Sequence, residues 1–198
     1  MYPKAVQNLI DKFAKFPSVG PKTAERLVFY LLKQKPEDLK ALADDLINIK
    51  NTVTRCSVCY SFSESNPCLI CSSEKRNKKI ICVVSKPQDI EIMEKTGSFN
   101  GLYFILGKNI NPLDSNNENS RIKELVERIE KDKPEEVILA LNPDLSGETT
   151  ILYLKKLLER FLELKISRLA RGLPMGADIE YADEITLENA ILGRQNLK

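Results

Sequence analysis

The stretch EEVILALNPDLSGETT, residues 135–150, contains the strand, the loop and the helix start that decide the fold class. Residues 137–141 form an apolar run, which is typical of a short strand buried on both faces of a sheet. The loop after this strand carries acidic groups and leads into a helical pattern. In α/β proteins, phosphates and metal ions bind at this position, at the carboxyl end of a strand. The loop 142–148 is therefore either a working metal site or the remains of one.

The same alternation of strand and helix extends on both sides of this stretch. The predicted strands are residues 80–84, 102–106, 137–141 and 164–169, and the predicted helices are 87–95, a helix capped by Ser120 and reaching about 129, and 148–161. This order predicts a parallel sheet covered on both sides by helices, with Cys82 in its core. A polar loop, INPLDSNNEN (110–119), separates the second strand from the next helix. Beyond residue 170 we expect a hairpin and a short closing helix.

Residues 1–50 predict three amphipathic helices with an excess of positive charge, because apolar side chains recur at helical spacing. Residues 1–35 carry 7 basic and 2 acidic side chains. Residues 1–79 carry 14 basic and 8 acidic groups, a net charge of +6, whereas residues 80–198 carry 16 and 20, a net charge of −4. A basic front end indicates an anionic partner, with nucleic acid first in line. A solvated helical surface is the alternative that charge alone leaves open.

The connection between the first two helices, FPSVGPKTAERL (16–27), resembles a helix-hairpin-helix DNA-binding motif. Gly20 lies in the turn, and Pro21 suits the start of the second helix. In that motif, backbone N–H groups at the helix start bind a DNA phosphate and read no base sequence. Ser18 stands where the motif has its first glycine, and serine resists positive φ, so this end of the turn is expected to differ. A hairpin that only packs is the alternative. The implied DNA-binding residues are Lys15, Gly20, Lys22 and Arg26.

Two C-x-x-C pairs, separated by eight residues, predict a zinc site. Each pair places two thiolates on one side of a tight turn, and two pairs complete a tetrahedral site of four sulfurs. Such a site has no open position for substrate, so one structural zinc ion per chain is expected. Redox-active cysteines are the alternative. The predicted ligands are Cys56, Cys59, Cys68 and Cys71.

Several classes of function are excluded by what the sequence lacks. The absence of histidine removes Ser-His-Asp and Cys-His catalysis. The tetrapeptide Gly20-Pro21-Lys22-Thr23 resembles the end of a nucleotide-binding P-loop, but Pro21 offers no backbone N–H, so ATP hydrolysis is not expected. No apolar run reaches the roughly 18–20 residues that span a membrane, and the amino terminus lacks the apolar core of a signal peptide. We therefore expect a cytoplasmic protein with no membrane partner.

The order of these parts resembles the RecR family of bacterial recombination mediators over essentially the whole chain. The resemblance includes ICVVSKPQDI (81–90), TGSFNGLYFIL (96–106), VILALNPDLSGETT (137–150) and SRLARGLPMGADIEYADEITL (167–187). It implies an α/β protein of four segments: a helix-hairpin-helix domain (1–51), a four-cysteine zinc finger (52–78), a Toprim domain with a Rossmann-like parallel sheet (79–170), and a C-terminal hairpin and helix for oligomerisation (171–198).

In catalytic Toprim domains, a glutamate after the first strand and a D-x-D-x-x-G loop after a later strand hold Mg²⁺. Ser85 stands at the glutamate position and Asn142 at the first aspartate, while Asp144, Gly147 and Glu148 are kept. Hard cations need several carboxylates, so the remaining set is a poor Mg²⁺ site. Ser146 also lies where family members often have an acid. Three roles stay open for the remaining acids, namely a helix cap, a contact with the partner RecO, and a residual metal site.

The resemblance implies a non-enzymatic DNA clamp in recombinational repair. It would act with RecO and RecF at gaps, load RecA on single-stranded DNA coated by SSB, and assemble as a dimer or ring-like tetramer. The alternative is a metal-dependent Toprim nuclease or topoisomerase-like enzyme, and Ser85 with Asn142 argues against it. A third alternative is a zinc-stabilised RNA-binding protein.

Overall fold

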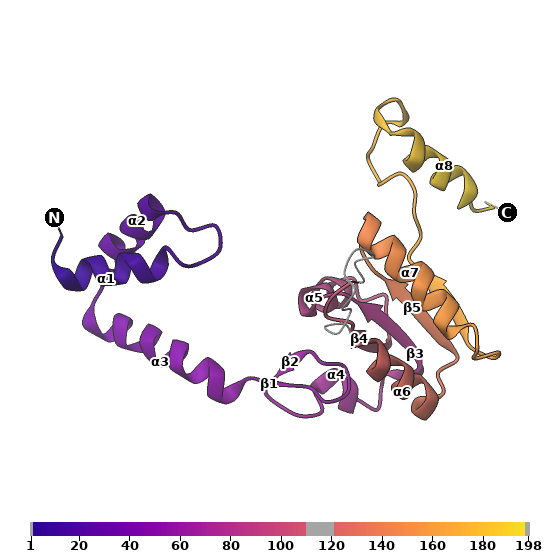
Figure 1. Ribbon diagram of the computed structural model, residues 1–198, viewed down its shortest axis with the longest axis horizontal. Coiled ribbons are helices and arrows are strands. Elements are labelled where there is room, and N and C mark those ends of the chain that lie inside the picture. The colour runs from indigo at the N-terminus through magenta and orange to yellow at the C-terminus, as the bar shows by residue number, and fades with distance from the viewer. Residues whose placement is uncertain (1, 110–120, 197–198) are drawn as a thin grey trace. The chain divides into compact units, whose positions relative to one another are not determined.

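The computed structural model describes residues 2–109 and 121–196 of the chain. These fall into two compact units, Met1–Val53 and Thr54–Lys198 (Figure 1). The polar loop predicted at 110–119 and the predicted cap Ser120 lie outside the described residues. Each unit has its own core, and each is described by itself.

The first unit consists of three helices, as predicted. They are α1 (Lys4–Phe13), α2 (Pro21–Leu31) and α3 (Pro36–Thr52). Helices α2 and α3 each have proline in their first turn, where the missing N–H costs no helical hydrogen bond. Ile10, Ala24 and Val28 are buried between α1 and α2. By contrast, none of the described side chains of α3 is buried.

The second unit begins with the cysteine segment and continues into a four-stranded sheet. The cysteine segment contains β1 (Thr54–Arg55) and β2 (Phe62–Ser63), which pair antiparallel, and the short helix α4 (Leu69–Ser72). The sheet strands are β3 (Asn77–Val84), β4 (Gly101–Ile105), β5 (Glu136–Ala140) and β6 (Lys165–Arg168). They are parallel and lie in the order β4-β3-β5-β6, so the predicted parallel sheet is confirmed.

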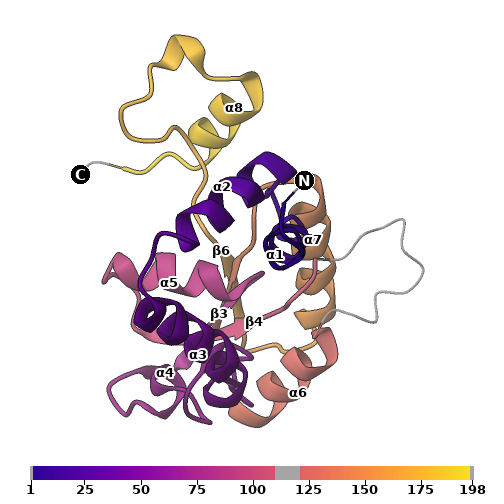
Figure 2. The ribbon, with the colours of Figure 1, turned by 90° about the vertical axis from the view of Figure 1, so that its left-hand side faces the viewer.

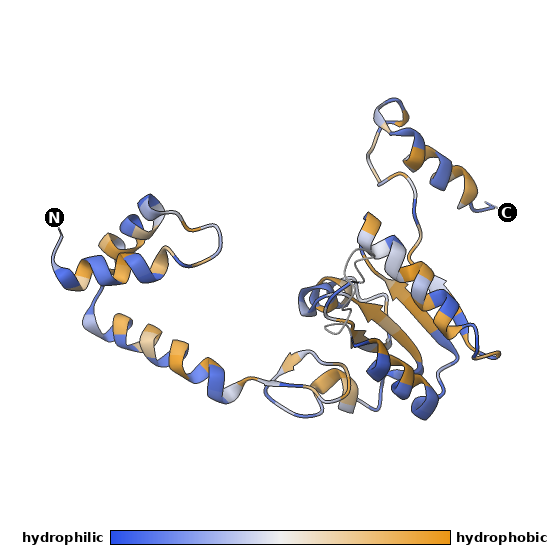
Figure 3. Ribbon diagram, viewed as in Figure 1, coloured by the Kyte–Doolittle hydropathy of each residue, from blue (hydrophilic) through white to orange (hydrophobic). Residues whose placement is uncertain are grey.

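Three helices cover the two faces of the sheet. These are α5 (Pro87–Lys95), α6 (Ile122–Asp132) and α7 (Leu145–Leu158). Helices α6 and α7 pack on the face that carries Ile81, Phe104 and Leu139, and α5 packs through Ile90 on the other face (Figure 2). The strands concentrate the apolar residues between these layers (Figure 3). Cys82 is a core residue, as predicted, and its burial raises the pKa of the thiol to about 12.

The start of α7 and the C-terminal segment differ from the sequence-based prediction. Helix α7 begins at Leu145, three residues before the predicted start, because Asp144 adopts an extended conformation and caps it. The C-terminal hairpin is not formed: the described residues 171–196 contain a 3₁₀ turn (Ile179–Tyr181) and α8 (Glu184–Leu192) but no strand. The backbone bonds of this segment are local, such as that from the N–H of Tyr181 to the carbonyl of Asp178, so no ladder between strands exists. The closing helix is confirmed.

Candidate nucleic-acid interface and metal centre

The turn between α1 and α2 places a bare helix start beside basic side chains. Gly20 is the N-cap of α2 and has no side chain to satisfy the first N–H groups. Val19 packs into the small core, which anchors the turn from within. The predicted contact residues Lys15, Gly20, Lys22 and Arg26 are all exposed. The geometry therefore offers an anion two features at once, free N–H groups and positive charge.

Ser18 is the residue of this turn that departs from the motif, and the structure gives it φ = 63°. This left-handed conformation costs an L-residue roughly 1–2 kcal/mol and is the reason that glycine is favoured there. The turn thus keeps its left-handed geometry at position 18 with serine in place. Gly20, by contrast, has φ = −82°, and an added Cβ would meet no atom within 4 Å.

The four predicted metal ligands come together in the cysteine segment. All four sulfur atoms lie within 4.8 Å of one another, and the Sγ atoms of Cys59 and Cys68 are 3.6 Å apart. Zinc–sulfur bonds of about 2.3 Å place the sulfurs of a tetrahedral site about 3.8 Å apart, so the spacing suits zinc. Among the described residues, the searched ligand types form this one cluster of three or more.

Local hydrogen bonds prepare these thiols for metal binding. The N–H groups of Val58 and Cys68 each donate to Cys56 Sγ at 3.4 Å. The hydrogen bond from Cys71 is the largest cause that lowers the pKa of Cys59, to about 5, and the same bond raises the pKa of Cys71. A thiolate is the form that ligates metal. The site fits one structural zinc ion, as predicted.

Arg128, on α6, joins the finger to the sheet, and the sequence analysis did not identify it. Its side chain is buried, and its Nη1 donates to the carbonyls of Val58 (3.1 Å) and Tyr103 (2.7 Å). Its Nε also pairs with Asp132 at 3.1 Å. Residue type alone does not distinguish Arg128 from the other charged residues of an amphipathic helix. The one available signal was its place among apolar residues on the buried face of α6.

The acidic loop lies at the carboxyl ends of β3 and β5, where Toprim enzymes hold their metal. Ser85 is buried, and its hydroxyl donates to Asn109 Oδ1 at 3.0 Å. Gly147 is required by close packing, since an added Cβ would lie 1.9 Å from the carbonyl oxygen of Asn142. The close approach of Gly147 to Asn142 shapes this turn of the loop. Among the described residues it does not gather three carboxylates.

The two remaining acids each have an intramolecular role. Asp144 Oδ1 accepts a hydrogen bond from the N–H of Gly147 at 2.7 Å, so the capping role is observed directly. Glu148 lies in the first turn of α7 and forms ion pairs with Arg168 (3.6 Å) and Arg171. Arg168 ends β6 and Arg171 follows it in the chain; neither was predicted from the sequence.

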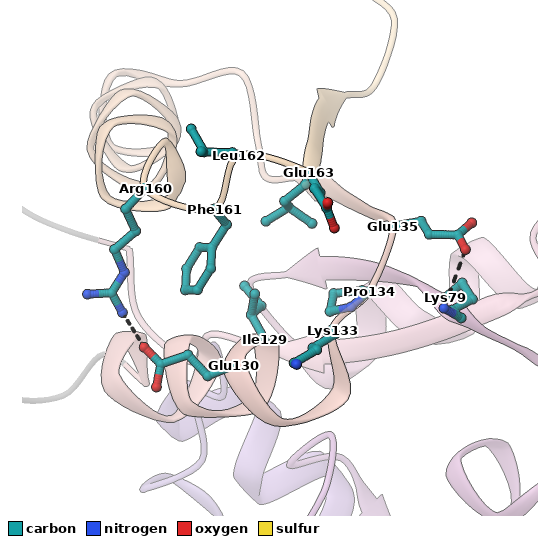
Figure 4. A pocket seen from close by; sticks show the side chains of 11 residues that line it. Lys79, Ile129, Glu130, Lys133, Pro134, Glu135, Arg160, Phe161, Leu162 and Glu163 are labelled. Atoms are coloured by element: carbon teal, nitrogen blue, oxygen red, sulfur yellow. Dashed lines mark hydrogen bonds and ion pairs between the residues drawn. The ribbon is translucent and has the colours of Figure 1, made fainter.

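A separate pocket of about 830 Å³ lies at the opposite, amino-terminal ends of β5 and β6 (Figure 4). Ile129 and Phe161 contribute its apolar side chains, and Leu162 lies at its margin. Charged groups on its rim pair with one another, as in the ion pairs Arg160–Glu130 (2.6 Å) and Lys79–Glu135 (3.4 Å). In open α/β proteins, ligands bind at the carboxyl ends of the parallel strands, so we do not assign a catalytic role to this pocket.

No helix within residues 2–109 and 121–196 combines the length and the apolar character needed to cross a membrane.

Comparison with known proteins finds matches along most of the chain. Family models match as follows: the RecR helix-hairpin-helix at residues 6–50; the RecR zinc finger domain of four cysteines at 53–73; the Toprim domain at 79–170; and the RecR C-terminal segment at 172–195. A recombination protein RecR of Chloroherpeton thalassium is 46% identical over 200 residues, which covers 98% of this chain and 97% of the relative. A recombination protein RecR of Staphylococcus aureus is 43% identical over 197 residues, covering 99% of each. With its helical hairpin, its four-cysteine cluster and its parallel sheet, the chain belongs to the RecR family of recombination repair proteins.

Proposed function

We propose that this protein is a non-enzymatic mediator of recombinational repair that holds DNA through the hairpin between α1 and α2. The observation that carries the proposal is the uncapped start of α2 at Gly20, with Lys22 and Arg26 exposed one turn apart. Lys15 lies in the connection between α1 and α2 and adds a third cation. Because such contacts reach phosphates only, binding is independent of base sequence, which suits a protein that acts at any gap.

The proposal includes no catalytic step of the protein's own. Strand cleavage by a Toprim site requires Mg²⁺ held by several carboxylates. Here Ser85 and Asn142 replace two of them, and Asp144 already accepts the N–H of Gly147. Two acids, Asp144 and Glu148, remain in the loop. Asp144 caps the start of α7, and Glu148 is paired with Arg168 and Arg171.

The partners in this proposal are RecO and RecF, which the Toprim segment would receive at the face that carries Asp144 and Glu148. The outcome would be the loading of RecA on single-stranded DNA coated by SSB at gaps, in the bacterial cytoplasm. Glu148 forms ion pairs with Arg168 and Arg171, so a basic partner would have to compete with these arginines. The charge reversal Glu148→Lys should therefore weaken RecO binding, and calorimetry with purified RecO measures this.

Assembly through both terminal segments completes the clamp. Helix α3 exposes Leu46 (63% exposed) and Ile47 (65%), and α8 exposes Leu192 (73%). Large apolar groups left in water on one face mark a protein interface. We therefore propose contacts between copies at α3 and at α8, which together would give a dimer or a ring-like tetramer. The four-segment division at 1–51, 52–78, 79–170 and 171–198 assigns these contacts to the first and last segments.

The DNA-binding surface is tested by charge reversal. The double variant Lys22→Glu/Arg26→Glu should bind gapped DNA more weakly in fluorescence anisotropy. The plot of the logarithm of the binding constant against the logarithm of salt concentration should become less steep by about two, because each lost phosphate contact removes the release of roughly one counterion. The matched control Lys155→Glu/Lys156→Glu lowers the net charge by the same four units (two changes of −2 each) on the exposed side of α7. Equal binding by wild type and the hairpin variant would reject the interface.

Two outcomes would favour the other classes of function. Reproducible DNA cleavage with Mg²⁺ or Mn²⁺, abolished by Asp144→Ala, would establish a Toprim enzyme. Preference for single-stranded RNA over gapped DNA in competition would establish an RNA-binding protein. The proposal requires neither.

A further inference from the structure

The strand β4 is at one edge of the sheet, yet all five of its residues are buried. An edge strand normally presents a row of unpaired N–H and C=O groups, which can pair with another chain. The N–H of Leu106 donates to the carbonyl of Val84 of β3 at 2.9 Å, so the N–H and C=O groups of Leu106 and of every second residue before it point toward β3. The N–H and C=O groups of residues 101, 103 and 105 therefore point away from β3. These outward groups are where a fifth strand would add.

Three arginines from different parts of the sequence occupy the outward carbonyls. Their Nη1 atoms donate as follows: Arg76 to Gly101 (3.5 Å), Arg128 to Tyr103 (2.7 Å) and Arg121 to Ile105 (3.2 Å). The outward N–H of Ile105 donates to the carbonyl of Cys59 at 2.9 Å. Guanidinium groups thus bind the three outward carbonyls, and one cysteine carbonyl accepts the outward N–H of Ile105.

Two of these arginines, Arg121 and Arg128, also hold the first zinc knuckle, residues 56–60. Arg128 Nη1 donates to the carbonyl of Val58 at 3.1 Å, and the guanidinium of Arg121 lies 4.8 Å from the ring centre of Tyr60. Tyr60 in turn contacts Phe104 of β4 edge-to-face, with ring centres 5.4 Å apart. The knuckle and the sheet edge therefore form one structure with shared contacts.

We propose that the zinc-held knuckle, with Arg76, Arg121 and Arg128, seals the open edge of the sheet, and that loss of zinc exposes β4 to pairing with the β4 of a second copy. The knuckle has almost no core besides the cysteines, so the metal holds its shape. The occupant follows from the sequence of the edge. Residues 100–106, NGLYFIL, contain no charge and no proline, the composition that favours self-pairing of identical strands.

Residue-resolved hydrogen exchange on the full-length, zinc-loaded protein tests the seal directly. At a protein concentration low enough to prevent pairing between copies, removal of zinc with a chelator should accelerate exchange of the Ile105 amide by at least roughly tenfold, because its acceptor, Cys59, leaves with the knuckle. The neighbouring Leu106 amide bonds to β3 and should keep its protection. The zinc-free protein should also form β-rich oligomers in light scattering and infrared spectra, and their formation should depend on protein concentration.

A variant with zinc in place separates the seal from general unfolding. Arg121→Lys removes the hydrogen bond to the carbonyl of Ile105 and the contact with Tyr60. Tyr60 follows Cys59, the acceptor of the Ile105 N–H, so the Ile105 amide should exchange several-fold faster at full zinc content. The matched control Arg160→Lys alters a surface ion pair with Glu130 and should leave both amides unchanged. Unchanged Ile105 exchange after zinc removal would overturn the proposal. Equal acceleration at Ile105 and Leu106 would also overturn it, because the knuckle would then support the whole sheet rather than its edge.

Discussion

The substitution Asp144→Ala separates the roles that the sequence left open for the acidic loop. It removes the hydrogen bond of 2.7 Å that the N–H of Gly147 donates to Oδ1, and it removes a negative charge at the start of α7. Loss of an N-cap costs about 1 kcal/mol, within a range of about 0.5–2, and loss of the charge costs about 0.3–1 kcal/mol. We therefore expect the free energy of unfolding to fall by roughly 1–2 kcal/mol. For a chain of this length, that equals a decrease in Tm of several degrees.

The matched variant Asp144→Asn keeps an N-cap oxygen but loses the charge, so it should cost no more than about 1 kcal/mol. Urea unfolding followed by far-UV circular dichroism, together with hydrogen exchange over residues 145–158, measures both variants. Mg²⁺ should stabilise neither wild type nor variants. Equal losses in the alanine and asparagine variants would refute the capping argument. Stabilisation of wild type alone by Mg²⁺ would show that the loop is still a metal site.

Three further predictions concern the hairpin, a partly buried ion pair and the finger. Ser18→Gly should raise the stability of the first unit by about 0.5–1 kcal/mol, because glycine accepts φ = 63° without strain; thermal unfolding that shows a loss would contradict this. The hydrogen bond from Arg76 lowers the pKa of Glu94, so the stability from this pair is complete above the ordinary carboxyl value of about 4.3 and is lost as pH falls through the lowered folded value. Glu94→Gln should accordingly be less stable than wild type at pH 7, with the gap closing in acid; a gap independent of pH would reject the ion pair. Metal analysis should find one zinc per chain, and Cys71→Ser should lose it; a folded wild type without zinc would contradict the finger.

Much of the fold was predictable because its signals are local. The apolar runs that became β3, β4 and β5 stand out within windows of five to eight residues. The spacing of the two C-x-x-C pairs was sufficient to identify the four metal ligands, since each knuckle is formed within a single turn. The predicted C-terminal hairpin was wrong because turn residues such as Gly176 are compatible with both a hairpin and an irregular loop.

The candidate site was predictable in part. The exposure of Lys22 and Arg26 beside the bare start of α2 follows from the sequence of one hairpin. The intramolecular partners of Glu148 could not be predicted from the sequence, because Arg168 and Arg171 lie some twenty residues further along the chain. Helical spacing identifies partners three or four residues away and gives no information about a side chain that returns from the next strand.

The sequence by itself determined the order of segments, the parallel sheet, the zinc ligands and the loss of the carboxylates that Mg²⁺ would need. Each of these depends on which residue types are present and on their spacing along the chain. Only the tertiary structure decided that Arg128 joins the finger to β4 and that three arginines cover the outward carbonyls of that strand. Gly101, Tyr103 and Ile105 receive donors from positions 76, 128 and 121, an order that does not follow the chain. Such contacts exist only once packing brings distant segments together, because a buried carbonyl must find a donor wherever the fold supplies one.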